Sequence, residues 1–133
     1  MAFVADNSVV VAWFIASQAN ARTDALLERA AVEDVHVPFI WRAEFAATLL
    51  AFSHNRRLQP ARVPAILDEL DQLDLVHDAA PPSARSLIEL ARRYALSAYD
   101  ACYLELALRL KIPLAARDAP LRKAADRAGI LLA

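Results

Sequence analysis

The chain has 133 residues, a formal net charge of −1 and one glycine, and 58% of its residues are hydrophobic. This length suits a single domain spanning residues 1–133, and the nearly balanced charge means that any nucleic-acid binding must rest on local basic patches. A P-loop and a dinucleotide-binding fingerprint are excluded, because both need several glycines where the backbone approaches phosphate groups.

Short apolar runs alternate with segments of helical periodicity, which predicts an α/β domain with a parallel sheet. In chain order, the first half is predicted to contain a strand at 2–5, helices at 7–15 and 21–31, a strand at 35–38, helices at 39–55 and 60–73, and a strand at 73–77. The second half is predicted to contain helices at 80–95 and 96–110, a strand at 112–116, a helix at 119–128 and a strand at 130–133. Gly129 is expected to end the helix that precedes it.

The hydrophobic content exceeds the usual value of about 45–50%, which indicates apolar surface covered by a partner, most simply a second copy of the chain. The helix at 39–55 carries large apolar side chains on more than one face. The single cysteine, Cys102, cannot form an internal disulfide, so we expect a reducing, cytoplasmic location. No stretch approaches the roughly 18 apolar residues of a membrane span, so no membrane association is expected.

Two acidic residues follow predicted strands. Asp6 comes directly after the strand at 2–5, and Asp118 follows the strand at 112–116 and precedes a helix. Sites in open parallel sheets form outside the carboxyl ends of the strands, where the strand order reverses. Because right-handed crossovers can place these two strands side by side, we expect the two carboxylates to lie close together.

Two further acids lie on predicted helices. Asp100 is in the first turn of the helix at 96–110, about 180° around the helix from Arg109, so it points away from the solvent-facing side. Glu44 shares a helical face with Thr48 and Asn55. Several carboxylates that lie within a few ångströms of one another need either raised pKa values or a bound cation. An all-oxygen set suits Mg²⁺ or Mn²⁺, which can activate water for attack on phosphorus.

Structural explanations for each acid stay open at this point. Asp6, or its neighbour Asn7, and Asp118 suit the N-cap position of a helix, and Glu44 suits a solvated helical stripe. Asp100 follows Ser97 by three residues, which is typical of a capping box. In that case the chain would be an interaction module without catalytic activity.

The segments "FVADNSVVVAWF", "VPFIWRAEFAATLL" and "LSAYDACYLELALRLKIPLAARDAPLRKAADRAGI" resemble the successive motifs of PIN domains. More closely, they resemble the VapC-type toxins of toxin–antitoxin modules, and "YDACYLELAL" followed by "PLAARD" is the most specific part. Other phosphate enzymes with an acid after the first strand fit poorly. Haloacid-dehalogenase-like phosphatases need an Asp-x-Asp pair where this chain has "DNS", and receiver domains need an acidic pair and a lysine that "ADNS" and "AARD" do not supply.

The resemblance implies a metal-dependent endoribonuclease with a three-layer α/β/α sandwich around a central parallel sheet. It also implies a Mg²⁺ or Mn²⁺ cofactor, an RNA substrate, a homodimer and a cognate antitoxin protein. The implied catalytic and metal-binding residues are Asp6, Glu44, Asp100 and Asp118, with Asp118 the most variable of the four and with Ser8 supporting Asp6. Candidate RNA contacts are the basic residues Arg92, Arg93, Arg117, Arg122 and Lys123.

Overall fold

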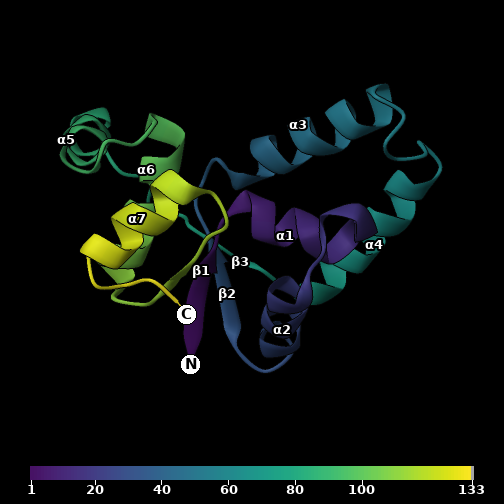
Figure 1. Cartoon of the computed structure of the whole chain (residues 1–133), viewed down its shortest axis with the longest axis horizontal. Coiled ribbons are helices and arrows are strands. Elements are labelled where there is room, and N and C mark those ends of the chain that lie inside the picture. Colours follow the sequence, from purple (N-terminus) through teal and green to yellow (C-terminus); the bar gives the residue numbers. More distant parts are fainter. Residues whose placement is uncertain (133) are drawn as a thin grey trace.

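Four short parallel strands form the centre of the molecule (Figure 1). The computed structural model describes residues 1–132, and its strands stand in the order β3, β2, β1, β4. β1 (Ala2–Ala5) pairs with β2 (Asp34–Val37) on one side and with β4 (Leu114–Ala115) on the other, and β3 (Val76–His77) pairs with β2. The chain therefore builds the sheet outward from β1 through β2 to β3 and then returns to the opposite side of β1, so the strand order reverses between β1 and β4.

Helices cover both faces of this sheet, which confirms the predicted three-layer α/β/α sandwich with a central parallel sheet. In Figure 1 one helical layer lies to the right of the strands and the other to the left. The right-hand layer contains α1 (Asn7–Phe14), α2 (Ala21–Ala30), α3 (Trp41–His54) and α4 (Arg62–Leu73), with the short 3-10 helix η1 (Ala16–Gln18) after α1. The left-hand layer contains α5 (Ala84–Tyr94), α6 (Ala98–Leu110) and α7 (Ala119–Arg127).

The core is centred on β1 and α6. Phe3, Val4 and Ala5 of β1 are fully buried, as expected for a parallel strand with helices on both faces. Helix α6 is apolar nearly all the way round because it packs against β1 on one side and is covered by α5 and α7 on others. Within residues 1–132, no helix is long and apolar enough to cross a membrane.

Local sequence signals explain most helix ends. Asn20 and Thr23 form a reciprocal capping box at the start of α2. Ser83 caps α5, so that helix begins after Pro81 and Pro82 rather than at the predicted residue 80. Gly129 follows α7 with a φ of 76°, the left-handed conformation expected of a glycine beyond a helix end.

Three predicted strands differ from the structure, and the one predicted at 112–116 is shortened to the two residues of β4. The strand at 73–77 is shorter than predicted, because α4 continues to Leu73 and Asp74 then adopts a left-handed φ of 52°. The strand at 130–133 is wrong as an element, because Leu131 makes one isolated parallel bridge to Leu114 and residue 133 lies outside the described residues. The neighbouring strand β4 is only two residues long, which limits the pairing that it offers.

We predict that Ile66→Ala lowers the free energy of unfolding by about 2–5 kcal/mol, because Ile66 is a fully buried side chain of α4 and its truncation leaves a cavity. Leu67→Ala on the same helix is the matched control, and it should cost well under half as much because Leu67 is 44% exposed. Urea unfolding measures both values. Equal losses would contradict the orientation of α4.

Candidate functional site

Asp6 follows β1 and accepts a hydrogen bond from the segment after β4, so it links the two strands between which the strand order reverses. It caps α1, with its Oδ1 accepting hydrogen bonds from the backbone N–H of Val9 at 2.9 Å and from the Ser8 hydroxyl at 2.9 Å. Its Oδ2 accepts the backbone N–H of Arg117, just beyond β4, at 3.2 Å. Burial raises the pKa of Asp6 to about 6, although these three hydrogen bonds act to lower it, and the charge of Asp118 raises it further.

Asp118 also caps a helix. Its Oδ2 accepts the backbone N–H of Leu121 at 3.2 Å at the start of α7. The N-cap interpretation is therefore correct for both Asp6 and Asp118. It does not exclude a second role, because a carboxylate has two oxygens and about four lone-pair positions, and each cap uses one oxygen.

Asp100 is different, because its carboxylate does not cap its helix. The Ser97 hydroxyl caps α6 by accepting the backbone N–H of Asp100 at 3.1 Å, so Asp100 contributes its main chain to the cap while its side chain extends elsewhere. Burial raises the pKa of Asp100 to about 6, and the charge of Asp118, a hydrogen bond shared with Asp118, and the charges of Asp6 and Glu44 raise it further. Asp100 is thus the carboxyl whose pKa is raised by all three of the other acids.

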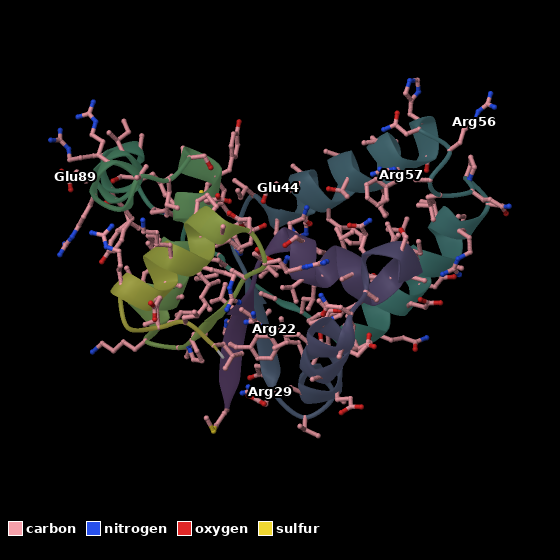
Figure 2. All side chains as sticks on the ribbon, viewed as in Figure 1. Arg22, Arg29, Glu44, Arg56, Arg57 and Glu89 are labelled. Atoms are coloured by element: carbon pink, nitrogen blue, oxygen red, sulfur yellow. The ribbon has the colours of Figure 1, made fainter. Side chains whose placement is uncertain are left out.

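Glu44 is held by a tyrosine from the opposite helical layer. The Tyr103 hydroxyl of α6 donates to Oε1 of Glu44 on α3 at 2.5 Å, and Figure 2 labels Glu44 at the end of α3 nearest to α6. Burial raises the pKa of Glu44, and the hydrogen bond from Tyr103 acts in the opposite direction. Tyr103 is 2% exposed, and its pKa is strongly raised by burial and by Glu44, so it stays a neutral donor.

Tyr103 is the residue that sequence reasoning did not place in the site. The available signal was its position three residues after Asp100, which puts both side chains on one face of α6. The solvated-stripe interpretation of Glu44 is wrong. Glu44 is half-buried, and Thr48 on the same face donates to the Glu44 carbonyl at 3.0 Å and accepts from Asn7 of α1 at 3.1 Å.

The acidic cluster, defined as Asp6, Glu44, Asp100 and Asp118, therefore comes from four separate segments: the ends of β1 and β4 and the first turns of α3 and α6. A hydrogen bond between two carboxyl groups needs a shared proton, and a cation between them would serve the same purpose. The donors are all oxygen, as Mg²⁺ and Mn²⁺ prefer. Within residues 1–132, no three Asp, Glu, His or Cys side chains already stand close enough to hold one ion, so metal binding would require these side chains to draw together.

The basic residues selected from the sequence fall into two groups. Arg92 and Arg93 in the last turn of α5 and Lys123 on α7 are exposed. Arg117 and Arg122 are half-buried, and each donates from Nη1 to a backbone carbonyl, that of Gln18 at 2.7 Å and that of Ala116 at 3.0 Å respectively. Of the five, Arg117 contacts the acidic cluster, through its backbone N–H.

Comparison with known proteins identifies the fold. The family model for the PIN domain matches residues 3–127, which is nearly the whole chain. A crystal structure of PAE2754 from Pyrobaculum aerophilum is similar, with a TM-score of 0.71 and 17% sequence identity over 93% of this chain and 84% of that one. At this identity the likeness shows a shared fold. A search of curated proteins finds no match.

We predict that the stability of the metal-free protein falls as pH rises from about 4 to about 6. Asp6 and Asp100 have pKa values of about 6 in the folded protein, above their ordinary 3.8, so the folded state holds protons that the unfolded chain releases. This stabilisation is complete below the unfolded pKa and is lost as pH passes through the folded one. Asp100→Asn should reduce this slope and raise the melting temperature at pH 7.

The measurement is thermal unfolding in EDTA across this pH range, with exposed Asp68→Asn on α4 as the control. His77 contributes a slope of opposite sign, because burial, aided by the charge of Arg42, lowers its pKa. The comparison is therefore made between the slopes of melting temperature against pH for the variant and the wild type, because His77 contributes equally to both. If the melting temperature of Asp100→Asn changed with pH in the same way as that of the wild type, Asp100 would not have a pKa raised by the other acids.

Proposed function

Because the chain belongs to the PIN domain family, whose members are generally nucleases, we propose that it is a Mg²⁺- or Mn²⁺-dependent endoribonuclease. The observation that carries the proposal is the position of Asp100. Its carboxylate is not needed to cap α6, is half-buried, and lies within the electrostatic influence of three acids from other segments. Ionising several carboxylates so close together costs free energy unless a cation binds between them or some of them stay protonated.

The residues of the cluster have distinct tasks in this proposal. Asp6, Glu44 and Asp100 would hold the ion, and Asp118 would complete the site from the start of α7. A bound Mg²⁺ or Mn²⁺ ion would supply activation of water and stabilisation of charge on the phosphate. Ser8 orients Asp6 through its hydroxyl, and Tyr103 orients Glu44 as a neutral hydrogen-bond donor. Both are positioning residues.

The alternative is an interaction module without catalytic activity, and the capping roles of Asp6 and Asp118 favour it. Caps alone would explain those two acids. They do not explain why Glu44 and Asp100 are half-buried beside them, since neither carboxylate caps its own helix. The nuclease proposal accounts for all four acids.

We predict that RNA cleavage is lost in EDTA and returns when Mg²⁺ or Mn²⁺ is added, and that Asp100→Asn abolishes cleavage while the protein stays folded. The asparagine keeps the size of the side chain but removes a negative charge that the ion would neutralise. Exposed Asp126→Asn on α7 is the matched control and should retain full activity. Cleavage of a labelled RNA measures activity, and circular dichroism reports folding. Full activity in the chelator, or an active Asp100→Asn protein, would return the acids to a purely structural role.

We predict that the products carry a 5′-phosphate and a 3′-hydroxyl, because water and not the neighbouring 2′-hydroxyl attacks the phosphorus. Cleavage should fall in single-stranded or loop RNA, because a flexible strand can bend its backbone toward a recessed site more easily than a stiff duplex can. End-group analysis of the fragments measures this. A 2′,3′-cyclic phosphate would rule out water as the nucleophile.

We further propose that the protein is the toxin of a toxin–antitoxin pair, acts in the cytoplasm and forms a homodimer that also binds its antitoxin. The toxin assignment rests on the resemblance of "YDACYLELAL" and "PLAARD" to VapC-type toxins. The buried free Cys102 suits a reducing compartment. Apolar exposure around α3 supports a protein contact, since Leu50 is 72% exposed and Phe39 is 43% exposed.

We predict that light scattering at micromolar concentration reports a mass near twice 14.6 kDa. Leu50→Glu should shift this mass toward that of a monomer, because it places a charge on the exposed apolar face of α3. Val32→Glu, at an even more exposed apolar position between α2 and β2, is the control and should leave the mass unchanged. A monomeric wild type would contradict the dimer.

A further inference from the structure

A cavity of about 290 Å³ lies beside the acidic cluster, on the side of α2. Three arginines line it, Arg22 from α2, Arg117 from the segment after β4, and Arg122 from α7, and among residues 1–132 no acidic side chain does. Asn20 and Thr23 at the start of α2 complete its polar wall. The volume is too small for a strand of RNA and suits a single phosphate group with part of a ribose.

Each of the three guanidinium groups is oriented by a backbone carbonyl. Arg22 donates from Nη2 to the Leu132 carbonyl at 2.7 Å, and Figure 2 labels Arg22 near the centre of the molecule, beside α2. Arg117 and Arg122 are held in the same way by the carbonyls of Gln18 and Ala116. A carbonyl fixes the direction of a guanidinium without neutralising its charge.

Among the described residues these three arginines have no ion-pair partner, whereas Arg29, Arg62 and Arg109 form salt bridges. The Nε of Arg22 is buried and has no hydrogen-bond partner among those residues. Each guanidinium has five N–H donors, so several remain for a ligand. Half-buried cations around one cavity repel one another, and an anion would relieve that repulsion.

The cavity and the acidic cluster share one short segment of chain. Ala116 and Arg117 line the cavity, the backbone N–H of Arg117 donates to Asp6, and the next residue is Asp118. A ligand in the cavity would therefore lie directly behind the loop that carries one acid of the cluster and contacts another. The order of the chain places positive charge on one side of this loop and negative charge on the other.

We propose that Arg22, Arg117 and Arg122 form an anion subsite that holds a phosphate of the RNA next to the one being cleaved. This rests on the proposed nuclease function. RNA is favoured because its backbone presents phosphates in continuous succession, so a strand whose scissile phosphate lies at the acidic cluster has a second phosphate to place in an adjoining basic cavity. Bidentate pairing of guanidinium with phosphate oxygens supplies the recognition.

The first test needs neither metal nor catalysis. In EDTA, inorganic phosphate should raise the melting temperature of the wild-type protein with saturation, compared with chloride at equal ionic strength. Arg22→Gln and Arg122→Gln should each lose most of this rise, whereas exposed Arg92→Gln on α5 should keep it. Two separate variants guard against the loss of one carbonyl contact disturbing the fold. Absence of a phosphate effect in the wild type, or its survival in both cavity variants, would overturn the subsite.

The second test identifies the source of the phosphate. Binding of an unstructured oligoribonucleotide is measured against salt concentration in EDTA. Loss of one phosphate contact should reduce the slope of log K against log[salt] by about 0.7, which is about a fivefold loss of affinity at 0.1 M salt. Arg22→Gln should show this change and Arg22→Lys should show less of it.

The two proposals can fail separately. If phosphate binds in the cavity and the RNA-binding slope is unchanged in Arg22→Gln, the cavity serves another anion, such as an acidic segment of a protein partner, and the RNA assignment is overturned. If the RNA tests succeed and the wild type cleaves no RNA with Mg²⁺ or Mn²⁺, the subsite stands and the nuclease function fails.

Discussion

The buried carboxylate of Asp6 is the interaction on which the rest of the site depends. It accepts two hydrogen bonds at the start of α1 and a third from the backbone of Arg117 beyond β4, so a single side chain fixes the ends of two neighbouring strands. Parallel strands deliver the residues that follow them to one edge of the sheet, and the reversal of strand order at β1 and β4 leaves that edge open to ligands. Burial at this point raises the pKa of Asp6, so the same group anchors the structure and binds a proton more readily than an exposed aspartate does.

The two helical layers contribute the remaining acids in different ways. Asp100 reaches the cluster because Ser97 caps α6 in its place, and Glu44 reaches it because Tyr103 crosses from α6 to α3. Within residues 1–132, the carboxylates of Asp6, Glu44 and Asp118 are thus supported by neutral hydroxyls or backbone N–H groups rather than by the side chain of a lysine or an arginine. Neutral supports orient carboxylates without cancelling their charge, so the cluster retains the negative potential that a divalent ion would neutralise.

Much of this could be read from the sequence because it follows from local rules. Asp6 and Asp118 were predictable neighbours, since each follows a buried strand and crossovers are right-handed. Tyr103 was not predictable as the partner of Glu44, because 59 residues separate the two and their meeting depends on how α3 and α6 are set across the sheet. Arg22 gave no signal either, since its cavity forms only when α2, α7 and the segment after β4 come together. The strand predicted at 130–133 is reduced to one bridge, because β4, the strand beside it, is only two residues long.

Calorimetry of Mn²⁺ binding shows directly whether the four acids act together as a site for a divalent ion. Asp6 and Asp100, with pKa values of about 6, must release protons when the ion binds near that pH. Titrations in two buffers of different ionisation enthalpy measure this release. We predict Mn²⁺ binding accompanied by proton release near pH 6, little release at about pH 8, and loss of binding in Asp100→Asn. Binding that releases no protons near pH 6, or that is unchanged in Asp100→Asn, would contradict this prediction.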